Sequence, residues 1–261
     1  MAEVIVITSG KGGVGKTTTT ANIGIGLAEP DRRVMLIDAD IGLRNLDVAL
    51  GLENNVVYDL VDVVSGYCTI SQAIISDSKY KNLYMIPAGQ TSDKDAVSVE
   101  QMKKLCQELK DEYDYILIDC PAGIEQGFKN AIAAADKAII VTTPDVSAVR
   151  DADRIIGLLE ENGILEYSLV LNKIRPEIVR VGNMFNVDDV LDSLKITLLG
   201  IIPDDTSIIV GAYKNEPVVL NKKSVAGQAY RNISMRITGK NVDLINLDKK
   251  RLFKKTKKYF R

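Results

Sequence analysis

The feature that most constrains this chain is a glycine-rich stretch that follows a short apolar run near the amino terminus. Residues 10–17 read Gly-Lys-Gly-Gly-Val-Gly-Lys-Thr, directly after the run Val4–Ile7. A buried strand, a glycine-rich turn and a helix start together form a phosphate-binding loop, in which backbone N–H groups surround phosphate oxygens. The sequence therefore predicts a site for ATP and Mg²⁺. The residues expected to contact them are Gly10, Lys11, Gly12, Gly13, Val14, Gly15, Lys16, Thr17 and Thr18.

The loop carries two lysines with different expected tasks. Lys16 stands where a phosphate loop needs a lysine to reach the β- and γ-phosphates, and the hydroxyl of Thr17 is placed to bind Mg²⁺. Lys11 follows the first glycine, where a generic phosphate loop has no requirement. We expect Lys11 to point outward, toward a second subunit; an ordinary solvated lysine is the alternative.

The composition is that of one globular domain without an evident membrane span. The chain has 261 residues, of which 46% are hydrophobic and 26% charged. No apolar run is long enough to cross a bilayer, and the first residues lead straight into a strand, so neither a transmembrane helix nor a signal peptide is expected. Three separated cysteines fit a reducing cytoplasm, and the absence of histidine leaves proton transfer to carboxylates, lysine or phosphate.

Apolar runs alternate with helical periodicity along the chain. The expected strands are 4–8, 33–37, 82–87, 115–119, 138–142, 168–172 and 196–202. The expected helices are 17–28, 97–110, 146–162 and 187–194. The runs are rich in Val, Ile and Leu without polar alternation, which indicates strands covered on both faces. The pattern predicts an α/β P-loop fold, a doubly wound and mostly parallel sheet with helices on both faces.

Carboxylates follow two of the expected strands. Asp38 and Asp40 follow the second strand, and Asp119 ends the strand at 115–119. Carboxylates at the carboxyl edge of such a sheet can hold Mg²⁺ through water and orient an attacking water. A turn-capping role for one of the first pair, and a structural role for Asp119, remain open.

Several stretches resemble a known family. Lys11–Thr17 reads K-G-G-V-G-K-T, the signature of the deviant Walker A ATPases. Asp40–Asp47 reads D-I-G-L-R-N-L-D and Asp119–Glu125 reads D-C-P-A-G-I-E, which resemble the septum-site-determining ATPases of bacterial division. Three shorter stretches agree with them: Val56–Asp59, Asp93–Ala96 and Ser147–Arg154. The resemblance covers essentially the whole chain.

The resemblance implies an ATP-dependent homodimer in which two subunits enclose two ATP molecules. Lys11 would then contact the partner's nucleotide, Lys16 would hold phosphate, and Asp40 would position the hydrolytic water, so that these three form the catalytic set. The metal site implied consists of Thr17, Asp38 and Asp119. Intrinsic hydrolysis is expected to be slow, because no arginine finger is evident.

The same resemblance implies contacts with the nucleoside and with partners. Glu125 would touch the ribose across the dimer, and the adenine would lie near Asn172, Pro203 and Asp204. A MinC-like division inhibitor and a MinE-like activator would meet the ATP-bound dimer. The residues implied for these partners are Arg44, Ser147, Asp151 and Asp153. An asparagine at a strand end is also an ordinary turn residue, and a solvated helix face is the alternative for the partner set.

The carboxyl end has a distinct composition. Residues 249–261 carry eight lysines and arginines and no acid, so the net charge of −2 leaves −10 on residues 1–248. As a helix, this segment would gather Leu252, Phe253, Tyr259 and Phe260 on one stripe, as in helices that lie on an anionic membrane surface. We expect an ATPase domain at 1–247 and a basic amphipathic membrane-targeting tail at 248–261. A disordered tail and a nucleic-acid-binding tail are the alternatives.

The expected protein is thus an ATPase switch that helps to place the division septum, cytoplasmic and peripheral on the inner membrane face when bound to ATP. Related ATPases of flagellar-number control or DNA partitioning, which act as nucleotide-dependent DNA- or partner-binding switches, are the alternative. An acidic body disfavours nucleic acid as the main partner. An iron–sulfur carrier would need paired cysteines, which Cys68, Cys106 and Cys120 do not provide.

Overall fold

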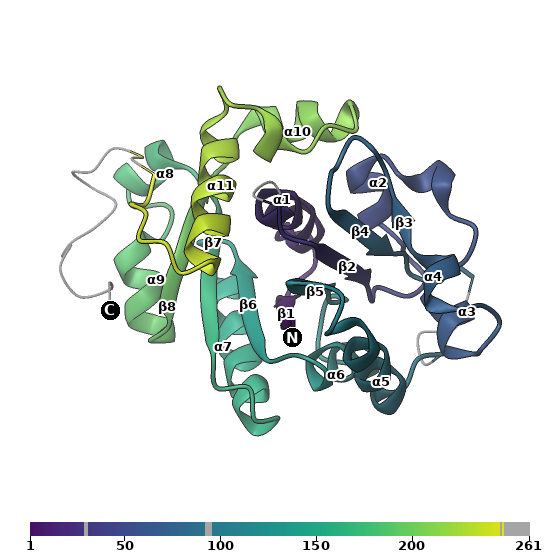
Figure 1. The fold of residues 1–261 in the computed structure, drawn as a ribbon. Helices are drawn as coiled ribbons and strands as arrows, with labels where there is room; N and C mark the ends of the chain where they lie inside the picture. The colour runs from purple at the N-terminus through teal and green to yellow at the C-terminus, as the bar shows by residue number, and fades with distance from the viewer. Residues whose placement is uncertain (29–30, 92–95, 246, 248–261) are drawn as a thin grey trace.

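A single mixed sheet forms the centre of the molecule (Figure 1). The computed structural model describes residues 1–28, 31–91, 96–245 and 247. The strands within these residues are β1 (Glu3–Thr8), β2 (Val34–Asp38), β3 (Ile75–Ser76), β4 (Leu83–Ile86), β5 (Tyr115–Asp119), β6 (Lys137–Thr142), β7 (Tyr167–Ile174) and β8 (Thr197–Pro203). Their order is β3-β4-β2-β5-β1-β6-β7-β8, and only the β3–β4 pair is antiparallel.

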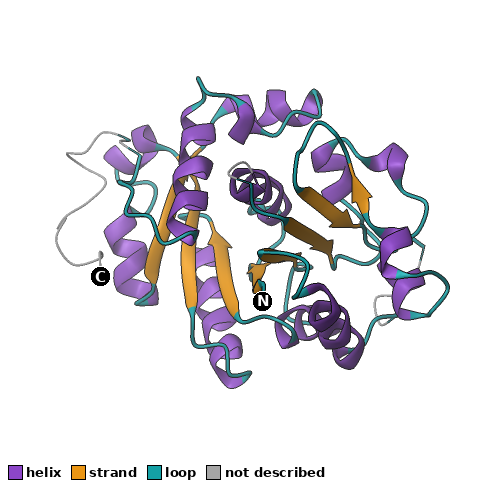
Figure 2. Cartoon of the chain, viewed as in Figure 1, coloured by secondary structure: helices purple, strands orange, loops and turns teal. Residues whose placement is uncertain are grey.

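Helices cover both faces of this sheet (Figure 2). The α-helices in the described residues are α1 (Lys16–Ala28), α2 (Leu46–Leu50), α3 (Leu60–Val64), α4 (Ile70–Ala73), α5 (Val99–Leu109), α6 (Gln126–Ala133), α7 (Val146–Glu161), α8 (Pro176–Arg180), α9 (Val187–Leu194), α10 (Thr206–Tyr213) and α11 (Val225–Ile237). The described residues also include two short 3-10 helices, η1 (Glu53–Asn55) and η2 (Val218–Leu220). In Figure 1, α1, α2, α10 and α11 lie on one side of the sheet and α5, α6 and α7 on the other.

The strand side chains divide between two cores, one on each face. In β1, Val4 and Val6 belong to the core that includes α5, α6 and α7, whereas Ile5 and Ile7 belong to the core that includes α1 and α11. Successive strand residues point to opposite faces, so a strand covered on both faces must be apolar throughout. This explains the absence of polar alternation and confirms the predicted doubly wound fold.

The predicted elements are present with shifts of no more than two residues at their ends. The structure adds elements that the sequence pattern did not reveal, among them β3, which has two residues, and the four- and five-residue helices α2, α3, α4 and α8. Segments this short contain too few positions for a periodic pattern to be recognised.

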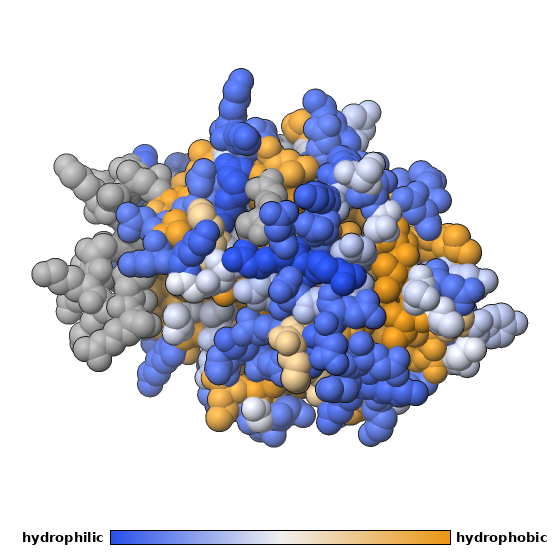
Figure 3. Space-filling model, viewed as in Figure 1, coloured by the Kyte–Doolittle hydropathy of each residue, from blue (hydrophilic) through white to orange (hydrophobic). Residues whose placement is uncertain are grey.

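The outer surface is mostly polar on the face drawn in Figure 3, where apolar side chains form separate patches between hydrophilic ones. Exposed apolar residues are expected on any soluble domain, so isolated ones need no special account. No helix in the part of the chain that the structure describes is long and apolar enough to span a bilayer.

The parallel arrangement fixes where the functional residues meet. Strands β2, β5, β1, β6 and β7 are neighbours and run in the same direction, so their carboxyl ends lie along one edge of the sheet. The predicted phosphate loop follows β1 at this edge. Side chains far apart in sequence therefore converge around it.

Candidate active site

The phosphate loop connects β1 to α1, and two of its glycines are required by close packing. A side chain on Gly10 would place its Cβ 2.5 Å from the backbone oxygen of Asp151 in α7. Gly15 has φ near +100°, and a Cβ there would overlap the amide nitrogen of Asn172. Only glycine readily adopts this positive φ and also leaves room for the Asn172 amide beside residue 15. The loop is thus seated between α7 and the end of β7.

Lys16 is the first residue of α1 and is only 8% exposed. Its Nζ donates a hydrogen bond to the Ser9 hydroxyl over 3.0 Å, and the same hydroxyl donates to the carbonyl oxygen of Lys11 over 2.8 Å. A buried ammonium group held inside the loop is placed to meet an anion there. The structure therefore puts Lys16 where the sequence predicts a phosphate-binding lysine.

Asp38 and Asp119 form a buried acidic pair beside α1. They end β2 and β5, are paired in the register of these strands, and are 0% and 1% exposed. Asp38 accepts hydrogen bonds from the backbone N–H of Asp40 at 3.0 Å and of Leu46 at 3.1 Å. Asp119 accepts one from the Thr20 hydroxyl at 2.9 Å.

This pair has an unusual electrostatic setting. Burial, and then the neighbouring charge of Asp119, raise the pKa of Asp38. Burial also raises the pKa of Asp119, against the opposing hydrogen bonds of Thr17 and Thr20 and the nearby Lys16 ammonium. Two ionised carboxylates on neighbouring strands repel each other, and a cation beside them would relieve this repulsion. The site therefore suits a divalent metal ion.

Asp40 and Glu125 line one hollow next to this pair. The hollow has a volume of about 280 Å³, and its wall includes Leu43, Pro121 and Ala122 as well as both acids. Asp40 is partly buried, whereas Glu125 is exposed just before α6. The structure thus brings the predicted water-positioning residue and the predicted ribose contact to the same wall of the site.

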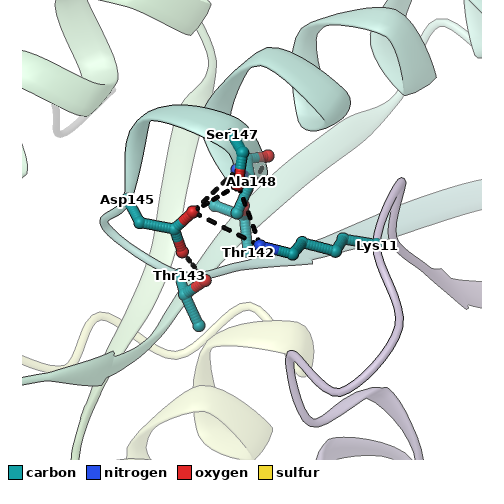
Figure 4. A network of polar contacts seen from close by, with 6 residues as sticks. All are labelled: Lys11, Thr142, Thr143, Asp145, Ser147 and Ala148. Atoms are coloured by element: carbon teal, nitrogen blue, oxygen red, sulfur yellow. Dashed lines mark hydrogen bonds and ion pairs between the residues drawn. The ribbon is translucent and has the colours of Figure 1, made fainter.

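Lys11 extends toward the start of α7, where Asp145 and Ser147 lie (Figure 4). Its Nζ donates to the Ser147 hydroxyl over 2.8 Å and lies 3.6 Å from Oδ1 of Asp145. The Lys11 and Asp145 side chains are 46% and 49% exposed. An ion pair this exposed is weak and screened by solvent. Lys11 is therefore accessible, and its contacts within its own subunit can be exchanged for others.

Asp145 caps the helix that receives Lys11. Its side chain accepts hydrogen bonds from the Thr143 hydroxyl at 2.6 Å, the Ala148 N–H at 3.0 Å and the Ser147 hydroxyl at 2.8 Å. Burial alone would raise its pKa, but these hydrogen bonds and the Lys11 charge lower the pKa of Asp145 to about 2. Asp145 is thus ionised at neutral pH and anchors the α7 N-terminus.

Asn172 and Lys173 meet the other side of the loop. The Asn172 amide donates to the carbonyl oxygen of Val14 over 2.7 Å, and the Lys173 Nζ donates to that of Gly13 over 2.7 Å. Asn172 is 3% exposed and lies near the end of β7. The predicted adenine contact therefore also supports the loop backbone.

Comparison with known proteins agrees with this arrangement. A family model described as the AAA domain matches residues 2–162. The septum site-determining protein MinD of Bacillus subtilis is 55% identical over 264 residues, covering 100% of this chain and 98% of the relative. The chain belongs to the MinD family. As a member of this family, it is an ATPase that takes part in determining the site of the division septum.

Two solved structures extend the similarity to three dimensions. The MinC:MinD cell division protein complex of Aquifex aeolicus matches with a TM-score of 0.88 and 48% identity, covering 93% of this chain and 98% of that one. The Pyrococcus horikoshii MinD complexed with Mg-ADP matches with a TM-score of 0.83 and 31% identity, covering 91% and 96%. The MinD fold thus extends over more than nine tenths of the chain.

The remaining predicted residues are spread around the edge of the site. Pro203 is the last residue of β8. The next residue, Asp204, forms an ion pair with Arg175. Arg175 in turn lines a hollow together with Lys11 and Gly13. Thr18 lies in the first turn of α1, where its carbonyl oxygen accepts a hydrogen bond from the Asn22 side chain at 2.7 Å.

The residues predicted to meet partner proteins differ in their exposure and in the contacts that they make within the subunit. Asp153 is exposed on α7, and Asp151 lies against Gly10. Arg44 has φ near +45° and forms an ion pair through its Nε, 2.8 Å from the fully buried Asp47. Its side chain is only 19% exposed, so loss of Arg44 would leave the buried Asp47 carboxylate without its ion-pair partner, which is destabilising.

Sequence patterns alone missed several residues at this site. Ser9 links the two loop lysines, Thr20 supports Asp119 from the second turn of α1, and Lys173 holds the loop from β7. Thr20 stands four residues after Lys16, and this helical spacing could have placed it on the same face of α1. Lys173 offered no such signal, because its position depends on how β7 ends. The predicted membrane residues Leu252, Phe253, Tyr259 and Phe260, and part of the stretch Asp93–Ala96, lie outside the described residues.

Proposed function

We propose that this chain is an ATP-dependent dimerising switch that associates with the inner face of the cell membrane through its tail. The switch recruits a MinC-like inhibitor and responds to a MinE-like activator, and so helps to place the division septum. The observation that carries the proposal is the contrast within one loop, where Lys16 is buried beside an acidic pair and Lys11 is exposed at the rim.

The nucleotide phosphates occupy the loop of residues 10–15 and the N-terminus of α1 in this proposal. Lys16 neutralises the phosphates, and the backbone N–H groups of the loop and the helix dipole add further favourable charge. The adenine is received near Asn172, Pro203 and Asp204, and Glu125 reaches the ribose of the partner's nucleotide. Phosphoryl transfer needs this kind of positioning more than it needs covalent chemistry by the protein.

The acidic pair supports a magnesium site in which a few protein ligands are combined with water and nucleotide oxygens. No group of three or more acidic or thiol side chains that could hold a metal is found in the described residues. Mg²⁺ usually takes few protein ligands and completes its shell with water and nucleotide oxygens, which fits Thr17 as a direct ligand with Asp38 and Asp119 behind it. When bound, Mg²⁺ neutralises charge on the phosphates. Asp40, which lines the same hollow as Glu125, orients the attacking water.

The position of Lys11 supports dimerisation. A single subunit can use this exposed ammonium only on its own α7, where its partners are Ser147 and Asp145. A second subunit docked on the same edge of the sheet offers a triphosphate, a much stronger anion. ATP would thereby close the dimer and present Ser147, Asp151, Asp153 and Arg44 at the rim to a partner protein. The MinC:MinD complex of the A. aeolicus relative supports this type of partner.

The tail converts dimerisation into membrane attachment. Burying one Leu or Phe side chain contributes roughly 1.5–3 kcal/mol, and each lysine near an anionic surface about 1 kcal/mol. Ordering a short segment offsets much of this gain, so one tail binds weakly. Two tails on one dimer bind far better, because insertion of the second is intramolecular.

Vesicle cosedimentation tests the proposal. The protein should sediment with phosphatidylglycerol vesicles in ATP, and much less in ADP or without nucleotide. Deletion of residues 248–261 should abolish sedimentation while ATP binding stays intact. Phe253→Ser should weaken sedimentation strongly, whereas the matched variant Thr256→Ser should leave it unchanged. Equal sedimentation in all nucleotide states, survival of binding after the deletion, or retention on DNA in place of vesicles would each contradict the proposal.

A further inference from the structure

The end of β7 departs from regular strand geometry beside the phosphate loop. Side chains on a regular strand alternate between its two faces. Here the pairing of β7 with β8 shifts between Leu171 and Ile174, and Lys173 adopts φ near +56°. As a result two consecutive side chains, those of Asn172 and Lys173, both reach the same loop. A positive φ at a lysine is unfavourable, so this local geometry is maintained by its surroundings.

The two side chains bind consecutive carbonyl groups of the loop. Lys173 Nζ donates to the Gly13 oxygen and Asn172 Nδ2 to the Val14 oxygen, each over 2.7 Å. In a trans peptide the C=O and the following N–H point in opposite directions. Fixing the Gly13 oxygen toward β7 therefore turns the Val14 N–H away from β7. Fixing the Val14 oxygen does the same for the Gly15 N–H.

We propose that Lys173 is a positioning residue for nucleotide binding. It acts through the Gly13–Val14 peptide, which it holds so that the Val14 amide faces the phosphates before any nucleotide arrives. Asn172 orients the next peptide, between Val14 and Gly15, in the same way, so that the Gly15 amide also faces the phosphates. The loop then loses less freedom when the phosphates bind, which increases affinity. This inference rests on the proposed function, because it requires that the loop binds the nucleotide's phosphates.

The position of Lys173 supports this role over that of an ordinary surface lysine. The residue is exposed, yet its ammonium contacts a backbone carbonyl 160 positions away in sequence. The chain provides a matched control in Lys195, which is also exposed and has φ near +52° but follows α9. Replacing either lysine removes one charge from a left-handed position. Only Lys173 contacts the phosphate loop.

Titration with Mg-ADP and with AMP, followed by calorimetry, tests the inference. Lys173→Met should weaken ADP binding by roughly five- to tenfold, the worth of one ordinary hydrogen bond, because Lys173 is exposed and solvent screens its charge. AMP, which lacks the β-phosphate, should lose less than about twofold, since fewer loop amides contact it. Lys173→Arg should restore most of the ADP affinity, and Lys195→Met should match the wild type.

A second readout separates positioning from a general effect on folding. In nucleotide-free protein, the amide resonances of Val14 and Gly15 should shift in Lys173→Met and not in Lys195→Met, with the melting temperature unchanged. Wild-type ADP affinity in Lys173→Met, equal losses for ADP and AMP, or unshifted amides would overturn the inference while leaving the proposed function in place. Failure of the wild-type chain to bind ADP would overturn both.

Discussion

The two lysines of the phosphate loop lie five positions apart and occupy opposite environments. Lys16 is 8% exposed, and its ammonium is held by Ser9 within the loop itself. The side chain of Lys11 is 46% exposed, and its ammonium crosses to Ser147 at the start of α7. One lysine is therefore confined within the loop of its own subunit, and the other is exposed at the surface, where we propose that a second subunit docks.

Under the proposed function, this difference predicts that substitutions in the loop can separate nucleotide binding from dimerisation. A buried ammonium is costly without an anion, so Lys16 favours occupancy of its own site. An exposed ammonium in a weak ion pair is easily transferred to a better partner. The same substitution at the two positions should therefore have different consequences, and it gives a direct test of the comparison.

The largest effect is expected for Lys16→Gln. Losing a buried charge-assisted contact should weaken ATP binding by roughly a hundredfold, and dimerisation with it. Calorimetry measures the affinity, and light scattering measures the dimer. An ATP-dependent dimer of normal stability in this variant would contradict the assignment of Lys16 to the subunit's own nucleotide.

Lys11→Gln should separate the two properties. ADP binding should stay within about twofold of the wild type, because the Lys11 side chain leaves the loop and contacts Ser147 on α7, while the backbone N–H groups of the loop are unchanged. ATP-dependent dimerisation should be lost, and hydrolysis should fall by roughly a hundredfold or more, as for removal of one group that stabilises transition-state charge. Lys103→Gln, an exposed lysine on α5, is the matched control. Parallel losses of ADP binding in the Lys11 and Lys16 variants would remove the distinction between them.

The smallest effect concerns Asp145, which holds Lys11 on its own subunit. The folded-state pKa of about 2 lies below the ordinary value of 3.8, so the ionised carboxylate stabilises the fold above pH 3.8. This contribution is lost as the pH falls from 3.8 toward 2. The side chain is half exposed, which limits the contribution to less than about 1 kcal/mol.

Asp145→Asn should therefore reduce the acid-dependent loss of stability, measured by urea unfolding between about pH 5 and about pH 2.5. Asp153→Asn, which removes an exposed acid from the same helix, serves as the control for the change in net charge. Identical pH slopes for all three proteins would show that the hydrogen bonds around Asp145 contribute nothing measurable.

Much of the fold was predictable because its strands are apolar on both faces. Val4–Ile7 and the corresponding parts of β2, β5 and β6 are buried in two cores at once, so their composition alone indicates a covered parallel sheet. Helix α11 escaped prediction although it has thirteen residues. Its buried face includes Gly227 and Ser234, and the Ser234 hydroxyl donates to the backbone of Tyr230 and Ile23. These small and polar residues weaken a helical pattern that is nonetheless present, since Ala226, Ala229, Tyr230 and Ile233 are buried at the i, i+3, i+4 and i+7 spacing of a helix.

The sequence by itself determined the phosphate loop, the strand-end acids Asp38 and Asp119, and the two-lysine signature, because each depends on residue type at short spacing. Tertiary structure alone decided which surfaces these residues meet. Lys11 contacts Ser147 and Lys173 contacts Gly13 because parallel strands bring distant chain segments to one edge of the sheet. Contacts across such distances depend on strand order and on the way a strand ends, and neither leaves a local pattern in the sequence.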